Sequence, residues 1–211
     1  RRDIRFHDVR FGYQGRGTVL AGFSLTLKKG GRYLLKGPSG CGKTTAVNLL
    51  LRYYEPDAGE ITVDGAPLRQ SGDPYARTTV VRQEAVLFRD TLRNNLSMYR
   101  PVPEDRLLDA LRSVGLDRFA SPDALDRMVE EGGANFSGGE KKRLCLARAL
   151  LRDTDVLILD EPLANLDRET VDRIEDLLLA IRDRTVLVVS HQFSPGKLGA
   201  FDEVKELAAG A

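Results

Sequence analysis

The stretch GPSGCGKTT, residues 37–45, constrains the fold more than any other part of the sequence. It fits the pattern G-x-x-x-x-G-K-[ST] through Gly37, Gly42, Lys43 and Thr44. It also stands between RYLLKG, which is typical of a strand, and TTAVNLLLRYY, which has the period of a helix. Glycine loops that join a strand to a helix hold phosphate groups on free backbone N–H groups. The sequence therefore predicts an α/β fold built around a phosphate-binding loop.

The residue types in this loop suit contact with a nucleotide phosphate and its metal ion. Glycines let the backbone wrap around phosphate oxygens, Lys43 supplies a positive charge to the outer phosphates, and the Thr44 hydroxyl can bind Mg²⁺. Thr45 could equally be an ordinary helix residue. The residues of the loop expected to contact nucleotide are Gly37, Pro38, Ser39, Gly40, Cys41, Gly42, Lys43, Thr44 and Thr45.

Changes in the hydrophobic period divide the chain into β-rich and helical parts. Residues 1–36 alternate apolar and polar positions, which predicts strands and a hairpin, and GEITVDG adds another strand. Residues 91–152 have a helical period, which predicts an inserted helical lobe. Two apolar runs at 156–160 and 185–190 are separated by a helical segment, and this order favours a parallel sheet covered on both faces.

We expect one domain over residues 1–211, with two subdivisions. The β-rich core with the phosphate loop would occupy about residues 1–90 and 153–211, and the helical subdomain about residues 91–152. The predicted fold is α/β, with a mainly parallel core sheet, an N-terminal antiparallel β subdomain and an inserted α-helical subdomain.

Composition and charge exclude several classes of protein. The chain has 32 Lys and Arg against 31 Asp and Glu, so it lacks the basic excess of a nucleic-acid-binding protein. Cys41 and Cys145 are too few for a disulfide framework, which favours a reducing, intracellular setting. No apolar run approaches the roughly 18 residues that cross a bilayer. The chain begins with Arg1 and without a signal-peptide pattern, so we expect a segment of a longer chain.

A second group of candidate residues follows the apolar run VLILD. Asp160 ends this run and Glu161 follows it, so one carboxylate could bind the metal ion and the other could activate water. Neighbouring side chains in a strand point to opposite faces, so both can serve one site only if the chain turns, and Pro162 is compatible with a turn. Taken alone, the pair could be solvated charges at the end of a core strand. The phosphate loop earlier in the chain favours the catalytic interpretation.

The stretch FSGGE, residues 136–140, is a second possible anion site. Ser137, Gly138 and Gly139 stand at the start of a helical segment, where free backbone N–H groups can bind an anion. Ser137 and Glu140 also fit the capping box S-x-x-E, which requires no ligand. The two glycines weaken a helix without improving its cap, so the sequence favours a ligand.

Together these motifs resemble the nucleotide-binding domain of an ATP-binding cassette (ABC) transporter. GPSGCGKTT, Gln83 in VRQEAVLF, FSGGE, LILDEP, ANLD and SH occur in the order of that family and across nearly the whole chain. FSGGE is the most specific motif, because other P-loop ATPase families lack it. The resemblance implies a P-loop NTPase core that binds and hydrolyses ATP with Mg²⁺.

The resemblance also implies roles for individual residues. Tyr13 would stack on adenine, Gln83 would sense Mg²⁺ and the transmembrane partner, Glu161 would be the general base, Asp167 would lie in a loop that couples two subunits, and His191 would contact the γ-phosphate. The expected catalytic residues are Glu161, His191, Lys43 and Gln83, and the expected metal ligands are Thr44, Gln83 and Asp160. Tyr13 could instead be a packing aromatic, Gln83 an ordinary polar residue and His191 a surface histidine.

In this family the signature segment, here FSGGE, contacts a nucleotide held by another subunit. The resemblance therefore implies a head-to-tail dimer around two MgATP, with Ser137, Gly138 and Gly139 facing the partner's γ-phosphate. The expected partners are a second nucleotide-binding domain and the transmembrane domains of a transporter, fused in the full-length chain, and no nucleic acid. The domain would then lie at the cytoplasmic face of a membrane.

The loops LFRDTLRNNL and VEEGGAN resemble the exporter branch of the family. Arg82 stands where the family usually has proline, Glu130 stands where exporters commonly have glycine, and the stretch 66–80 is shortened. Glu140 replaces the usual glutamine of the signature, and Asn165 replaces a small residue. These departures bear on the contact with transmembrane domains more than on the chemistry of ATP.

Three other functions share some of these motifs. A DNA-repair or chromosome-organising ATPase would carry a long coiled coil between Gln83 and Ser137 of the signature, where this chain has only residues 84–136. A small-molecule kinase with a phosphate loop would share only the first motif. A non-catalytic nucleotide-binding module would not need Glu161 and His191.

Overall fold

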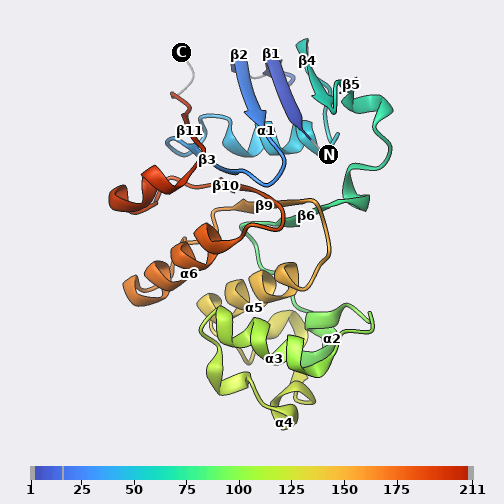
Figure 1. The fold of residues 1–211 in the computed structure, drawn as a ribbon, viewed down its shortest axis with the longest axis vertical. Helices are drawn as coiled ribbons and strands as arrows, with labels where there is room; N and C mark the ends of the chain where they lie inside the picture. Colours follow the sequence, from blue (N-terminus) through green and yellow to red (C-terminus); the bar gives the residue numbers. More distant parts are fainter. Residues whose placement is uncertain (1–2, 16, 209–211) are drawn as a thin grey trace. The chain divides into compact units, whose positions relative to one another are not determined.

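The structure is a computed structural model that describes residues 3–15 and 17–208 (Figure 1). The chain forms two compact units. The first contains the residues up to Thr79, Thr154–Glu161 and the residues from Ile181 onward, and the second contains Val80–Asp153 and Pro162–Ala180. Within the described residues, no helix has both the length and the apolar character that a membrane crossing requires.

An antiparallel sheet in the first unit has the strand order β2-β1-β4-β5. Its strands are β1 (Ile4–Gly12), β2 (Thr18–Leu27), β4 (Ala58–Val63) and β5 (Ala66–Pro67). Buried and exposed residues largely alternate along β1, as expected for a strand with one face on a core. This confirms the antiparallel β subdomain and the hairpin that the alternating sequence predicts.

A second sheet has the order β11-β3-β10-β9-β6. Its strands are β3 (Arg32–Lys36), β6 (Thr78–Val81), β9 (Val156–Asp160), β10 (Thr185–Val189) and β11 (Glu203–Glu206). Strands β9, β10, β3 and β11 pair in parallel, and every residue of β9 and β10 is buried. The continuous apolar runs of the sequence therefore form the centre of a parallel sheet, as predicted. Helix α1 (Lys43–Leu50) follows β3 through the phosphate loop.

The second unit is mainly helical. Its helices are α2 (Leu92–Ser97), α3 (Glu104–Ser113), α4 (Pro122–Leu125), α5 (Gly138–Leu150) and α6 (Arg168–Ala180), and the short strands β7 (Asp90–Thr91) and β8 (Met128–Val129) pair antiparallel. Leucines at 92, 96, 107, 111, 125 and 144 are almost completely buried, which is what the helical period predicts. Short 3₁₀ turns occupy Leu68–Gln70, Pro74–Ala76 and Pro195–Ala200 in the first unit, and Asp117–Phe119 and Glu131–Gly133 in the second.

Candidate nucleotide-binding site

The phosphate loop passes closely against its neighbours, and its glycines make this possible. A Cβ at Gly37 would lie 2.5 Å from the carbonyl oxygen of Leu207 and 2.6 Å from Cys41 Sγ. Gly42 has φ +102°, and a Cβ there would lie 2.9 Å from a side chain of β2. Gly40 has φ +81° with no neighbour within 4 Å of its Cβ position, so the loop is open on that side. This is the close, curved backbone that a phosphate cradle requires.

Lys43 is held inside this loop. Its Nζ donates hydrogen bonds of 2.8 Å to the carbonyl oxygens of Gly37 and Pro38, and it lies 3.8 Å from Glu161 Oε1. Only 6% of the side chain is exposed. A buried ammonium group that donates hydrogen bonds to carbonyl oxygens can donate them to phosphate oxygens instead, because both are hydrogen-bond acceptors.

Thr44 and Asp160 come together at the end of β9. The Thr44 hydroxyl lies 3.2 Å from Asp160 Oδ2 and 3.4 Å from Oδ1. Asp160 is almost completely buried, whereas Thr44 is exposed on the first turn of α1. A hydroxyl and a carboxylate are hard oxygen donors of the kind that Mg²⁺ binds, usually together with substrate phosphates and water. Two of the three expected metal ligands therefore fit the ion and lie side by side.

Glu161 turns the chain directly after β9. Its φ of 52° is in the left-handed region, and its N–H donates a 2.8 Å hydrogen bond to the carbonyl oxygen of Val189 in β10. The turn expected at the end of this strand therefore occurs at Glu161 itself. Because of it, the carboxylates of Asp160 and Glu161 both lie near the phosphate loop, one against Thr44 and the other against Lys43.

The Glu161 carboxylate is connected to the residues that follow β10. Its Oε2 lies 2.9 Å from His191 Nδ1 and 3.4 Å from both the hydroxyl of Ser190 and the backbone nitrogen of His191. Glu161 is 9% exposed, whereas the His191 side chain is 45% exposed. A carboxylate held on one oxygen by a histidine and facing a lysine on the other is oriented as a general base needs to be.

Tyr13 follows β1 and contacts the first turn of α1. Its hydroxyl is 3.1 Å from Thr45 Oγ1. This hydrogen bond connects Tyr13 to Thr45, and both residues are expected to contact nucleotide. Its ring makes T-shaped contacts with Phe11, at 5.1 Å between centroids, and with Tyr54, at 5.3 Å. Sequence analysis missed Tyr54, although the aromatic pair after α1 in LLRYY was a visible signal.

The signature FSGGE begins helix α5 in the second unit. Ser137 is the N-cap: its hydroxyl accepts the N–H of Glu140 at 3.3 Å, and Glu140 Oε2 accepts the N–H of Ser137 at 2.9 Å. The capping box that the sequence allowed is therefore present. Ser137 and Gly138 remain exposed, and a Cβ at Gly138 would meet no atom within 4 Å. The cap and an external anion are compatible, because a hydroxyl that accepts one hydrogen bond can still donate another.

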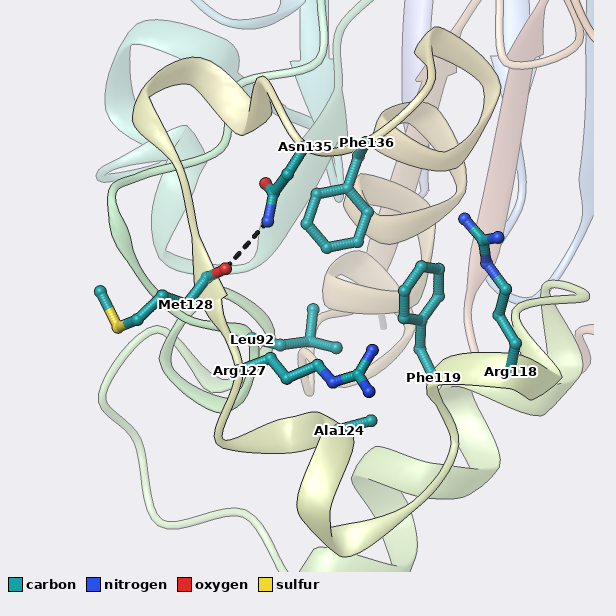
Figure 2. Close-up of a pocket in the computed structure, with 8 residues that line it drawn as sticks. All are labelled: Leu92, Arg118, Phe119, Ala124, Arg127, Met128, Asn135 and Phe136. Carbon is teal, nitrogen blue, oxygen red and sulfur yellow. Dashed lines mark hydrogen bonds between the residues drawn. The ribbon is translucent and has the colours of Figure 1, made fainter.

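A cavity of about 550 Å³ lies beside the signature in the second unit (Figure 2). Asn135 ties the loop in front of the signature to β8, because its Nδ2 donates a 3.0 Å hydrogen bond to the carbonyl oxygen of Met128. The described residues that line the cavity include two arginines and no acidic residue: they are Leu92, Arg118, Phe119, Ala124, Arg127, Met128, Asn135 and Phe136. The lining therefore carries two basic side chains, of which Arg118 forms an ion pair with Glu140 of the signature.

Gln83 and Asp167 also belong to the second unit. Gln83 is exposed between β6 and β7. Asp167 accepts hydrogen bonds from the backbone N–H of Thr170 at 2.9 Å and from its hydroxyl at 2.7 Å, which caps the start of α6. These bonds from Thr170 lower the pKa of Asp167 below its usual value. The roles of both residues toward nucleotide stay predictions.

A family model described as ABC transporter matches residues 20–164. The chain belongs to the ABC transporter family. The ABC chain is 36% identical to P-glycoprotein 14 of Caenorhabditis elegans over 199 residues, which is 90% of the chain and 15% of that protein. It is 38% identical to an ATP-dependent lipid A-core flippase of Mannheimia succiniciproducens over 200 residues, which is 91% of the chain and 34% of the flippase.

Among solved structures, the whole ABC chain matches a bacterial Atm1-family ABC exporter with ATP bound. The TM-score is 0.84, the identity is 29%, and the match covers 100% of this chain and 38% of the exporter chain. The chain thus spans about a third or less of the length of the two curated relatives. The family model implies ATP binding, which agrees with the geometry of the phosphate loop.

Proposed function

We propose that residues 1–211 act as a single ATPase domain that powers transport across a membrane in an exporter-type ABC transporter. The observation that carries the proposal is the position of Glu161. Its carboxylate lies between Lys43 of the phosphate loop and His191 at the end of β10, next to the Thr44–Asp160 pair. The names of the relatives, a P-glycoprotein and a flippase, favour export over import.

In the proposed reaction, the loop residues 37–45 bind the phosphates of ATP through backbone N–H groups, and Lys43 exchanges its carbonyl partners for phosphate oxygens. Thr44 and Asp160 would hold Mg²⁺, with Gln83 as the third proposed ligand, and the ion would neutralise charge that develops on the phosphates. Glu161 accepts a proton from the attacking water, and His191 orients the Glu161 carboxylate and contacts the γ-phosphate.

The signature FSGGE is a second phosphate-binding element, and in this proposal it acts on a second subunit. We propose that Ser137, Gly138 and Gly139 complete the site of a partner domain in a head-to-tail dimer around two MgATP, with Asp167 in the loop that couples the two sites. Tyr13 would stack on adenine. Transmembrane domains, fused in the full-length chain, would hold each ATPase domain at the cytoplasmic face of the membrane. The structural neighbour is an exporter with ATP bound, which supports ATP binding and the exporter-type assignment.

The variant Glu161→Gln tests the proposed hydrolysis. The amide keeps the size of the side chain and an oxygen that can face His191, but it cannot accept the proton from water. We expect the rate of phosphate release to fall by about 10²- to 10⁴-fold, with MgATP affinity preserved in calorimetry. The matched control is Glu60→Gln, which changes an exposed carboxylate on β4 of the same unit. Equal turnover in Glu161→Gln and the parent would exclude Glu161 as the base.

A further inference from the structure

The signature of this chain contains a negative charge close to the atoms that would receive a phosphate. Glu140 Oε2 is 2.9 Å from the backbone nitrogen of Ser137. Burial alone would raise the pKa of Glu140, but hydrogen bonds from Ser137 and the charges of Arg118 and Arg143 hold this pKa below its usual value. Glu140 is therefore ionised at neutral pH, and an ionised carboxylate at this place repels an incoming γ-phosphate.

Arg118 is the residue that offsets this charge. Its guanidinium forms an ion pair with Glu140 Oε1 and lies 4.6 Å from the ring centroid of Phe119. The Arg118 side chain is 67% exposed, whereas that of Glu140 is 11% exposed, so the pair reaches from the helix start to the surface. Figure 2 shows Arg118 on the wall of the cavity beside Phe119.

The other arginine near Glu140 has different partners. Arg143 Nη1 donates a 2.7 Å hydrogen bond to the carbonyl oxygen of Gly115, and its Nε lies 3.4 Å from the carbonyl oxygen of Gly139. Arg143 thus fixes backbone groups around the start of α5, while Arg118 pairs directly with the carboxylate.

We propose that Arg118 is a positioning residue that lets a carboxylate-bearing signature accept the γ-phosphate of a partner subunit. The inference rests on the proposed ATP-dependent dimer. The capping box does not need the ion pair, because a glutamine oxygen can also accept the N–H of Ser137. The function of Arg118 is therefore to neutralise the Glu140 charge beside the backbone N–H of Ser137.

The test measures the MgATP concentration that gives half-maximal dimer, by light scattering after gel filtration, in a Glu161→Gln background that retains ATP. Two unit charges about 5 Å apart at a partly exposed site change binding by roughly fivefold to tenfold. We expect Arg118→Met to raise the half-maximal concentration by about this factor at low salt. We expect the double variant Arg118→Met with Glu140→Gln to return close to the parent, because it has lost both charges.

Two further measurements separate charge from folding. Added salt should reduce the defect of Arg118→Met, since ions screen exposed charges over distances of about 10 Å at 0.1 M. Glu140→Gln alone should dimerise at a lower MgATP concentration than the parent, because it removes the repulsion and leaves Arg118 unpaired. This second variant tests the proposal even if Arg118→Met does not fold.

Each other outcome counts against the proposal. If Arg118→Met matches the parent, or if its defect persists in the double variant and at high salt, Arg118 supports the fold only. If Glu140→Gln needs more MgATP than the parent, the Glu140 charge assists binding and the inference is wrong. A parent that stays monomeric at saturating MgATP would overturn the proposed dimer itself, whereas a dimerising parent with unaffected variants would overturn this inference alone.

Discussion

Both the ring and the hydroxyl of Tyr13 make contacts that fix the side chain. Its ring packs edge-on against Phe11 and Tyr54, and its hydroxyl is bonded to Thr45 on the first turn of α1. An aromatic ring fixed next to a phosphate loop is in position to stack on a nucleotide base, and the same contacts would suit a ring that only packs against the sheet. The same sequence position fits base stacking and packing against the sheet, and single-residue variants distinguish the two roles.

We expect Tyr13→Leu to weaken ATP binding by about tenfold or more, because base stacking on an aromatic ring contributes about 1–3 kcal/mol. Tyr13→Phe keeps the ring and should bind ATP nearly as the parent does. Neither change should affect inorganic triphosphate, which has no base. Calorimetry with both ligands measures this difference, and Tyr53→Leu, at a tyrosine that is 55% exposed, is the control. A similar loss for both ligands would mean that Tyr13 supports the loop and does not contact adenine.

At the scale of elements, the pairing of β1 with β4 depends on one close backbone approach. The register runs from Ile4 opposite Val63 to His7 opposite Glu60, and it then shifts at a bulge where Asp8 has φ 47°. Gly59, with φ +77°, faces this bulge, and a Cβ there would lie 2.2 Å from the carbonyl oxygen of Asp8. Only glycine allows the two backbones to meet in this way.

Gly59→Ala should therefore lower the free energy of unfolding by more than about 3 kcal/mol, because it adds a backbone clash to a left-handed conformation. Gly65→Ala is the matched control. Gly65 has φ +82° with no atom within 4 Å of its Cβ position, so the loss there should be about 1 kcal/mol. Urea denaturation of both variants measures the difference. Equal losses would show that the chain relieves the clash by shifting β4.

Local patterns predicted the elements that depend on local physics. The buried runs of β9 and β10 follow from the hydrophobic period, and the structure has them. The S-x-x-E spacing also allowed the capping box that the structure has at Ser137, although the sequence favoured a ligand there. The contact of Tyr54 with Tyr13 and the ion pair of Arg118 with Glu140 were not predicted. These pairs join residues far apart in the sequence, and neither periodicity nor turn chemistry carries information about such distances.

At the scale of the whole molecule, the two anion-binding elements belong to different compact units. The phosphate loop and Glu161 are in the first unit, and the signature at Ser137 is in the second. If the signature serves a partner, hydrolysis depends on assembly. The isolated domain should be monomeric without ATP, and its specific activity should rise with protein concentration, because each subunit must find its partner by diffusion.

Mixing two inactive variants tests this arrangement. Ser137→Arg should bind ATP through its own Lys43 and block the partner's γ-phosphate, while Glu161→Gln lacks the base. In a head-to-tail heterodimer one site carries both lesions and the other carries none. Steady-state phosphate release should therefore recover in part when the two are mixed.

Two results would contradict the dimer. One is a mixture that stays inactive although heterodimers form, and the other is an activity per molecule that is independent of concentration in a proven monomer. In either case the capping box alone would account for the signature sequence. Each single variant at the same total concentration is the control for the mixture.

The left-handed backbone at position 161 lowers the stability of the fold, while the proposed hydrolysis requires a glutamate there. Glycine, asparagine or aspartate would adopt this conformation with less strain than glutamate, which is rarely found there. At an active site, such strain costs about 1–3 kcal/mol and persists because the surrounding structure holds the residue in place. A lineage released from the need to hydrolyse nucleotide would therefore lose Glu161 early, and the protein would become more stable as it became inactive.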